Sequence, residues 1–399
     1  MIIPSYKHLG GVHPDTAALK NILASMGVKA PHTGKPFTEA MLLGIGGGLG
    51  AGYILWEFKK YASAILVLAF RNNWQYPVKF MQNLCGRLGA KLIIKETAGQ
   101  KAAASNLTDA LAKGKPVIAW VDQHKLPYLH VPDYYDGCFF HVVGVYGIDE
   151  AKGEVLIDDR GTMPFMVGAE QFAKARARIV SFKNRLMMVE APAKIDLHKA
   201  ILVGIRDGAA HLSKPSTSFS LPAFLKWAKL MTDAKDQKAW SKVFAKPLGL
   251  YSTLRSIYEG ISVVGTSGGC LRGLYADFLE ESGTVLNKPK LKEVAAQYKA
   301  LDKMWNAFAE AALPDAVKPL KETKTLLVQR DEALKTKGQS GLEELEKVGQ
   351  QLHAMREAFD KKFPMNDSDI ATLFADMQKH LYGIYETEVK ANAALRDVV

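Results

Sequence analysis

The sequence predicts an α+β domain over residues 1–195, followed by an all-α helical domain over residues 196–399. In the first part, short runs of β-branched residues alternate with helical patterns between Gly, Pro and Asp, as in a domain with a central sheet. The second part reads almost entirely as amphipathic helix, which favours a helical bundle. A chain of 399 residues also exceeds one ordinary core, since cores stop growing at about 250–300 residues.

The first predicted helix runs from Thr16 to Met26 and ends at Gly27. Its apolar residues recur at helical spacing and define a buried face: Ala17, Leu19, Ile22, Leu23 and Met26. The elements expected after it, in chain order, are a strand at 64–70, a helix at 78–89, a strand at 91–96, a helix at 105–112, and strands at 116–122, 139–149 and 153–161.

The second part contains long amphipathic stretches, three of them between Lys290 and Val399. The Ser-, Thr- and Pro-rich segment 213–222 is expected to be a loop between the first helices. Residues 342–359, LEELEKVGQQLHAMREAF, resemble a coiled coil. Packing within the bundle is the simpler interpretation, and a homodimer formed through such helices is the alternative.

Cysteine usage and the N-terminus point to a cytoplasmic protein. Cys85, Cys138 and Cys270 lie far apart with no CxxC spacing, so we expect no disulfide framework and no thiolate zinc site. The N-terminal segment lacks a cationic stretch followed by a long apolar run. The most apolar stretch, residues 61–70, is too short to span a bilayer, so no membrane association is expected.

The formal net charge of +11 favours acidic partners, which could be nucleic acid, anionic lipid or an acidic carrier protein. The lysines are spread along helical segments and alternate with acidic residues. This pattern lacks the basic cluster with interleaved aromatic residues that a nucleic-acid groove requires, so we expect no nucleic-acid partner. An ordinary solvated surface is the plain alternative.

A histidine and a pair of carboxylates follow one another on the last predicted strands of the first part. His141 stands in the run FFHVVGVYG, and the next strand ends in Asp158 and Asp159. Two strands joined by a tight turn at 149–153 bring an imidazole beside a carboxylate. A carboxylate orients the imidazole of a general base in this way, although the same pattern also occurs in purely structural pairs.

The segment 44–54, GIGGGLGAGYI, is rich in glycine but does not predict a dinucleotide site. A helical pattern precedes it where a strand is required, and no acidic residue at the usual distance completes the unit. Glycine does permit close backbone approach and amides turned toward an anion or a thioester. The candidate substrate-binding residues here are Gly46, Gly47, Gly48 and Gly50.

The segment 122–137 holds His124, His130 and several carboxylates, which raises the possibility of a metal site. Their spacing fits no standard ligand set, and the prolines favour a rigid loop beside a substrate, with Tyr128 as a candidate substrate-binding residue. We therefore expect neither a metal nor a cofactor.

Taken together, these motifs resemble the butirosin biosynthesis protein H-like family, an acyltransferase class of aminoglycoside biosynthesis. The resemblance extends over nearly the whole chain and lies in several blocks in order: VHPDTAALKNIL (12–23), TEAMLLGIGGGLGAGYI (38–54), GKPVIAWVDQHKLPY (114–128), HVVGVYGID (141–149) with VLIDDRG (155–161), and GTSGGCLRGLYADFLEES (265–282).

The resemblance implies a papain-like N-terminal domain, similar to the bacteriocin-processing cysteine peptidases, and a C-terminal helical domain. The family has His-Cys at the start of its first helix, where the helix dipole favours a reactive thiolate. This chain has His13-Pro14 there, and proline fits a first helical turn but cannot attack a carbonyl. His8 occupies the place of the oxyanion donor, and the family pattern favours Asp159 over Asp158 as the partner of His141.

The activity implied is transfer of an acyl group from the phosphopantetheine thioester of an acyl carrier protein to a small-molecule amine. Because a thioester is already activated, an amine positioned beside His141 as general base can react without a cysteine nucleophile. We expect an acyl or aminoacyl transferase, or an amide-forming cyclase, in the biosynthesis of a natural product such as an antibiotic. The alternative is a catalytically inactive member that binds a carrier protein or metabolite as a scaffold.

Overall fold

The computed structural model describes residues 1–398, which form two compact units, each assembled from three stretches of chain. The first unit contains residues 1–42, 88–196 and 329–351. The second contains residues 43–87, 197–328 and those from Leu352 onward. One boundary, after Asp196, lies beside the division expected from the sequence, yet each unit also includes chain from the other half.

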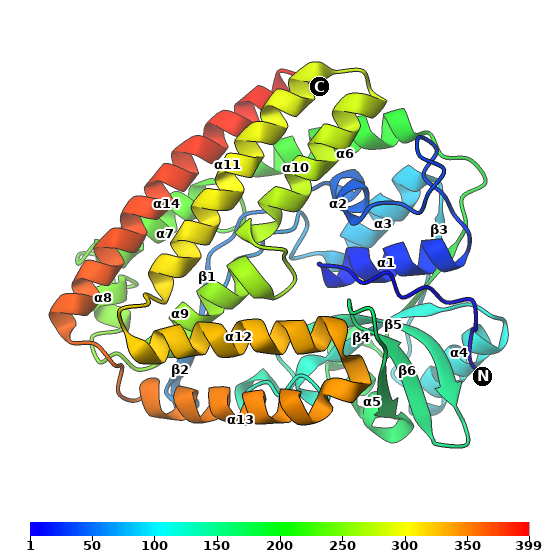
Figure 1. Cartoon of the computed structure of the whole chain (residues 1–399), viewed down its shortest axis with the longest axis horizontal. Helices are drawn as coiled ribbons and strands as arrows, with labels where there is room; N and C mark the ends of the chain where they lie inside the picture. The colour runs from blue at the N-terminus through cyan, green and yellow to red at the C-terminus, as the bar shows by residue number, and fades with distance from the viewer. Residues whose placement is uncertain (399) are drawn as a thin grey trace. The chain divides into compact units, whose positions relative to one another are not determined.

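A six-stranded sheet forms the centre of the first unit (Figure 1). Every neighbouring pair in it is antiparallel. The strands, in their order across the sheet, are β3 (Lys91–Lys95), β8 (Leu186–Glu190), β4 (Val117–Asp122), β5 (Phe140–Asp149), β6 (Glu154–Asp158) and β7 (Phe165–Gly168). The strands predicted at 91–96, 116–122, 139–149 and 153–161 are confirmed, whereas β7 and β8 were not predicted.

Helices cover this sheet. Every residue of β4 is buried, as is β5 from His141 to Gly147, so both faces of the central strands are covered. Helix α1 (Pro14–Ser25) packs on β4 and β5, while α4 (Gln100–Ala112) and α5 (Ala169–Ala177) contact the sheet and each other. The first predicted helix is confirmed, but Met26 follows its last residue and is 37% exposed, so it is not part of the buried face.

A segment from the C-terminal half completes the first unit. It comprises the end of α12 (Lys318–Thr336), a 3₁₀ turn (Gly338–Gly341) and the start of α13 (Leu342–Phe359), and we call residues 329–351 the hairpin. The backbone N–H of Thr162 donates to the Lys335 carbonyl at 2.8 Å, and that of Gln339 donates to the Pro164 carbonyl at 2.9 Å. The hairpin thereby holds the chain that links β6 to β7.

The second unit is predominantly helical, which confirms the expectation for the C-terminal part. Its longest helices, α11 (Pro289–Ala312) and α14 (Asp367–Arg396), lie side by side (Figure 1). Other helices of this unit are α3 (Pro77–Leu88), α6 (Leu197–Leu212), α7 (Pro222–Thr232), α8 (Trp240–Val243), α9 (Leu250–Tyr258) and α10 (Arg272–Val285). The loop expected at 213–222 lies between α6 and α7, except that Pro222 is already the first residue of α7.

One predicted strand belongs to a different sheet from the one expected. The run at 64–70 forms β2 (Ser63–Val67), which pairs with β1 (Ile54–Phe58) in a separate two-stranded antiparallel sheet of the second unit. The expectation that this run joins the central sheet is therefore wrong. A β-branched run predicts an extended segment, but it does not identify the partner strand.

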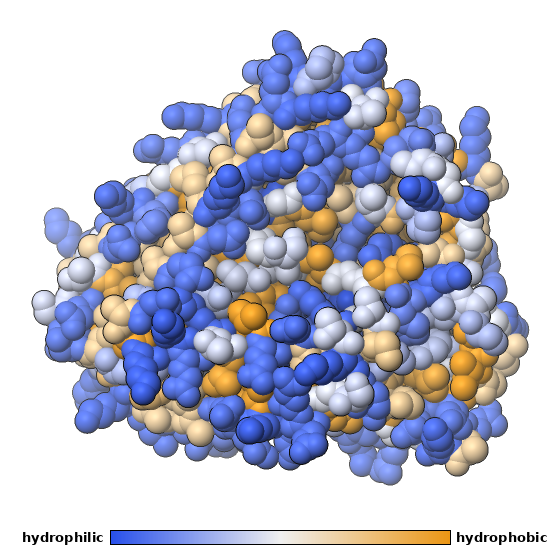
Figure 2. Space-filling model, in the orientation of Figure 1, coloured by the Kyte–Doolittle hydropathy of each residue, from blue (hydrophilic) through white to orange (hydrophobic). Residues whose placement is uncertain are grey.

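Hydrophilic residues dominate the face of the molecule seen in Figure 2, and hydrophobic ones are scattered between them. Such scattered apolar residues are ordinary on protein surfaces. No helix within residues 1–398 combines the length and the apolar character needed to cross a bilayer.

Candidate functional site

The structure brings His141, the first buried residue of β5, together with Asp159, the residue after β6. The Nε2 atom of His141 lies 2.8 Å from both carboxylate oxygens of Asp159. Asp158 pairs with Gly144 across the two strands. Because successive residues of a strand point to opposite faces, Asp159 projects to the face that carries His141, and Asp158 projects to the other.

Asp159 is held by two further donors. The hydroxyl of Tyr128 donates to its Oδ2 at 3.0 Å, and Nε of Arg160 donates to its Oδ1 at 2.9 Å. Burial alone would raise the pKa of Asp159, but the electrostatic attraction of His141 and Arg160 and their hydrogen bonds outweigh burial, so the pKa of Asp159 lies well below its usual value. Tyr128 also stacks on Phe165 with ring centroids 4.0 Å apart, which fixes its hydroxyl on the carboxylate.

The other ring nitrogen of His141, Nδ1, has no hydrogen-bond partner within residues 1–398. It is not sealed from solvent either, although the residue as a whole is only 7% exposed. Asp159 thus binds the Nε2 atom of His141, and the Nδ1 atom stays open to a ligand. An imidazole oriented by a carboxylate through one nitrogen can exchange a proton through the other, as a general base requires.

Asp158 has an environment of its own on the opposite face. Its Oδ2 accepts hydrogen bonds from the Tyr6 hydroxyl at 2.6 Å and from Nδ2 of Asn21 on α1 at 2.8 Å. Its Oδ1 is buried without a partner within residues 1–398. Burial raises the pKa of Asp158 to about 6, although both hydrogen bonds lower it. Asp158 therefore titrates near neutrality and does not touch His141.

His8 lies with the aromatic residues of that same face. Its ring meets Tyr6 and Tyr146 edge-on, with centroids 5.1 Å and 4.8 Å apart. Burial lowers the pKa of His8, which favours a neutral imidazole. The structure therefore groups this candidate oxyanion donor with Asp158 and not with the His141–Asp159 pair.

The start of α1 is stabilised by a carboxylate. The backbone N–H groups of Val12 and His13 donate to Glu39 at 2.8 and 2.7 Å. His13 precedes the helix, Pro14 is its first residue, and the His13 Nδ1 atom lies 3.6 Å from Asp15 Oδ2. Glu39 thus occupies the positive end of the helix dipole at the start of α1.

The loop before α1 also lies beside residues 160–162, which follow Asp159. A Cβ atom on Gly10 would lie 3.5 Å from the carbonyl oxygen of Arg160 and 3.4 Å from Cγ2 of Thr162. Gly10 has a φ of +64°, a conformation that glycine adopts without steric cost. The exit of β6 is thus packed between this loop and the hairpin.

No cysteine occupies a position typical of a nucleophile. Cys138 is exposed in a turn before β5, so it does not share a strand with His141. Cys85 and Cys270 belong to the second unit and are buried there. Burial raises the pKa of Cys85 to about 12 and that of Cys270 well above its usual value, which suppresses the thiolate form.

The glycine-rich segment lies in the second unit, where it ends helix α2 (Glu39–Gly46). The N–H groups of Gly47 and Gly48 donate to carbonyls of that helix, and the N–H of Gly50 donates to the Phe70 carbonyl at 2.6 Å. These amides are therefore not available to a thioester.

The space beside these glycines is also filled. A Cβ atom would lie 2.5 Å from the Phe80 ring at Gly46, 2.6 Å from the Asn72 side chain at Gly47, and 2.5 Å from the Tyr275 ring at Gly48. Close packing accounts for the small residues. Their role in substrate binding stays a prediction.

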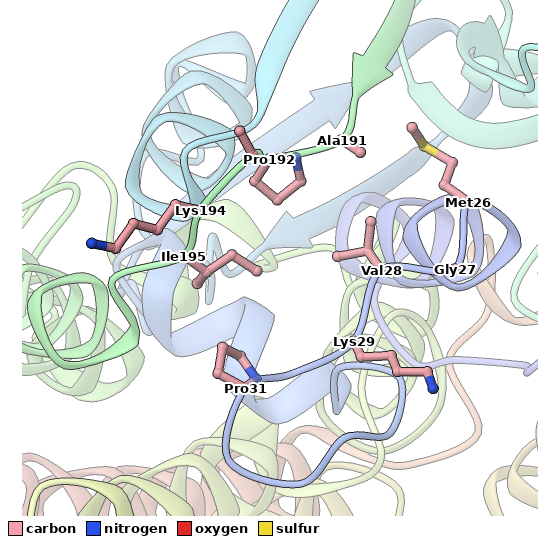
Figure 3. A pocket seen from close by; sticks show the side chains of 10 residues that line it. Met26, Gly27, Val28, Lys29, Pro31, Ala191, Pro192, Lys194 and Ile195 are labelled. Atoms are coloured by element: carbon pink, nitrogen blue, oxygen red, sulfur yellow. The ribbon is translucent and has the colours of Figure 1, made fainter.

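An open pocket of about 350 Å³ lies elsewhere in the first unit (Figure 3). It lies between the loop after α1 and the segment after β8, at the opposite end of α1 from His13. None of the sequence-predicted site residues lines it. The ten lining residues are Met26, Gly27, Val28, Lys29, Pro31, Ala191, Pro192, Ala193, Lys194 and Ile195.

Sequence reasoning missed four residues of the site and its surroundings: Tyr6, Asn21, Glu39 and Arg160. The first three act on partners between 23 and 152 positions away, so no local pattern could reveal them. Arg160 directly follows Asp158 and Asp159 in the sequence. A cationic residue next to a predicted catalytic Asp could have identified Arg160 as part of the site.

Two family models match the chain. The butirosin biosynthesis protein H N-terminal domain matches residues 13–160, which include His13, His141 and Asp159. A domain of unknown function (DUF4872) matches residues 170–347. None of the curated proteins matches the chain. The chain thus carries a butirosin biosynthesis protein H N-terminal domain followed by a domain of unknown function, in agreement with the resemblance inferred from its sequence.

Proposed function

We propose that the protein transfers an acyl or aminoacyl group from a carrier-protein thioester to an amine, either in another molecule or in the same one, with His141 as general base. The N-terminal family match links the chain to antibiotic biosynthesis of the butirosin type. The observation that carries the proposal is the buried His141–Asp159 pair, which occupies Nε2 and leaves Nδ1 open. The papain-like fold is part of the proposal, supported by a helix packed on an antiparallel sheet that carries His and Asp on adjacent strands.

The reaction needs no acyl-enzyme. The amine nitrogen attacks the thioester carbonyl, and His141 accepts a proton from that nitrogen at Nδ1. The C–S bond then breaks, and His141 returns the proton to the leaving thiolate. Asp159 stays ionised and stabilises the imidazolium between the two steps. Positioning of the amine supplies the rest of the acceleration.

A second candidate is a non-catalytic scaffold that binds a carrier protein or a metabolite. Two observations favour it: proline is the first residue of α1, and Glu39 satisfies the backbone donors at that helix start. The retained His141–Asp159 pair favours the enzyme, because a scaffold has no need of an oriented imidazole.

His141→Ala tests the enzyme directly. It should lower the rate of thiol release from an acyl N-acetylcysteamine thioester, supplied with a panel of amines, by about 10²–10⁴-fold, the usual contribution of a general base. His32→Ala removes an exposed imidazole of the same unit and should leave the rate unchanged. Equal rates for the two variants would exclude His141 as the general base, and a wild type that releases no thiol above the uncatalysed rate would support the scaffold.

The absence of a covalent step has its own test. A triple variant, Cys85→Ser, Cys138→Ser and Cys270→Ser, should retain activity within about tenfold, because removing a true nucleophile normally abolishes turnover. A larger loss from Cys138→Ser alone, in folded protein, would show that the exposed thiol is the nucleophile. The buried Cys85 and Cys270 are changed singly as folding controls.

A further inference from the structure

Arg160 has more hydrogen-bond donors than its surroundings use. The residue is 8% exposed, and its Nε donates to Asp159. A guanidinium carries five N–H donors, so four remain on the two terminal nitrogens. Neither terminal nitrogen has a partner within the part of the chain that the structure describes, and neither is sealed from solvent. A side chain more than nine-tenths buried thus presents unused donors to an accessible space.

The backbone at Arg160 has an unusual conformation. Arg160 has a φ of +61°, in the left-handed region that costs a non-glycine residue about 1–2 kcal/mol. The neighbouring chain leaves little room for another conformation, because a Cβ atom on Gly10 would lie 3.5 Å from the Arg160 carbonyl oxygen, and the hairpin holds Thr162 through the Lys335 carbonyl. Such strain persists where the surroundings over-determine it, as they do here.

Asp331, a further carboxylate that interacts with Arg160, does not accept hydrogen bonds from the terminal nitrogens of Arg160. Asp331 of the hairpin attracts Arg160 electrostatically, but its own ion pair is with Lys335, at 2.6 Å. Asp159 and Asp331 offset part of the guanidinium charge, so we expect small anions to bind with millimolar dissociation constants, or about −4 kcal/mol.

The position of Arg160 relative to His141 places these free donors near the proposed general base. Both side chains donate to, or share a proton with, the same carboxylate of Asp159, so the guanidinium and the imidazole lie on the order of 5 Å apart. The open Nδ1 of His141 and the open terminal nitrogens of Arg160 therefore lie within about 10 Å of each other, and a ligand of that length contacts both. The planar fork of a guanidinium matches the two oxygens of a carboxylate or phosphate.

We propose that the terminal nitrogens of Arg160 bind an oxyanion group of the substrate held at His141. The inference rests on the proposed acyl transfer and narrows its substrate class. The group is either a carboxylate of the acyl chain or acceptor, or the phosphate of the phosphopantetheine arm. Because the reacting amine lies at His141, Arg160 acts in binding and orientation.

The test measures thermal stability of the full chain with sodium acetate or inorganic phosphate, at constant ionic strength set with sodium chloride. An anion that binds the folded protein raises its Tm by mass action. The wild type and Arg178→Gln should show this rise, since Arg178 is an exposed arginine of the same unit paired with Asp136. Arg160→Gln should lose it. Arg160→Lys, which keeps the charge but not the fork, should retain less than half.

Each outcome decides something. A rise with phosphate alone assigns the pantetheine phosphate, and a rise with acetate assigns a carboxylate. The same rise in all four proteins, or none in the wild type, overturns the proposal. Because no acyl transfer occurs in this assay, anion binding without activity would remove only the proposed function, and activity without anion binding would remove only the role of Arg160.

Discussion

The adjacent carboxylates Asp158 and Asp159 show how one strand end creates two chemical environments. Because successive residues of a strand point to opposite faces, Asp159 meets His141 and Arg160, whereas Asp158 accepts hydrogen bonds from the neutral side chains of Tyr6 and Asn21. Their pKa values consequently move in opposite directions. In enzymes, a pair of this kind separates a group that stays ionised from one that can hold a proton near pH 7.

This difference predicts a pH dependence for Asp158. Its pKa rises from 3.8 to about 6 on folding, so its contribution to stability is fully present below pH 4 and is lost as pH rises through 6. The loss amounts to about 3 kcal/mol, at 1.36 kcal/mol for each pKa unit. Asp158→Asn removes the ionisation and should therefore stabilise the protein more at pH 7.5 than at pH 4.5.

Urea unfolding of the wild type and Asp158→Asn at the two pH values measures this difference. Asp109→Asn serves as control, because Asp109 is exposed in the same unit. An equal change at both pH values would mean that the Asp158 carboxyl titrates normally in the folded state. The pH dependence of stability that arises from Asp159 runs the other way. The stability that this carboxylate supplies is present above pH 4 and is lost only in stronger acid.

At the level of elements, the sequence predicted those strands that have a clear pattern. Runs such as PVIAWVD and FFHVVGVYG are rich in β-branched and aromatic residues, and both became central strands. The strand β8, LMMVE, contains two methionines and one valine, so nothing in it distinguished a strand from a helix. It nevertheless lies between β3 and β4, where long-range pairing fixed its conformation.

The His141–Asp159 pair was predictable because it depends on two neighbouring strands and a short turn. The hairpin was not, because its contacts join residues near 162 to residues near 335. No local pattern reports a contact across that separation. The hydrogen bonds of Tyr6 and Asn21 to Asp158 could not be predicted for the same reason, because these residues lie 152 and 137 positions from Asp158.

Gly161→Ala tests the contact between the hairpin and the exit of β6. A Cβ atom at residue 161 would lie 2.9 Å from the carbonyl oxygen of Leu334 and 3.1 Å from that of Lys335. Both are backbone atoms and cannot rotate away. We therefore expect the free energy of unfolding to fall by about 1–3 kcal/mol, as in other overpacked sites. Amide hydrogen exchange at Thr162 and Gln339 should accelerate.

Gly168→Ala is the matched control for that experiment. Gly168 lies in the same unit, at the end of β7, and a Cβ atom there would meet nothing within 4 Å. Unchanged exchange at Thr162 in Gly161→Ala would show that the hairpin does not depend on this close approach.

At the level of the whole molecule, the first unit depends on chain from both halves of the sequence. A truncated chain of residues 1–196 lacks the hairpin, so the Thr162 N–H loses the Lys335 carbonyl and the Met166 N–H loses the Gln339 side chain. We expect the fragment to be less stable than the full chain by several kcal/mol, with rapid exchange at Thr162 and Met166. A fragment as well protected as the full chain would contradict this dependence.

The charge of the whole chain makes a prediction about the partner. A protein of net charge +11 should bind an acidic carrier protein in a salt-dependent manner, because screening acts over about 10 Å at 0.1 M salt. Titration at about 50 mM and 500 mM sodium chloride should show at least a tenfold loss of affinity. Duplex DNA should bind weakly and without sequence preference. Salt-independent carrier binding, or none, would leave a diffusing small molecule as the acyl donor.

The alternation of the chain between the units also determines the order in which they can be completed during synthesis. The sheet strands end at residue 190, but the hairpin that completes their unit begins at residue 329. At about 5–20 residues per second, a ribosome needs on the order of ten seconds to deliver the missing segment. During that interval β7 lacks its contacts with the hairpin, so we expect this edge of the sheet to be exposed in the nascent chain.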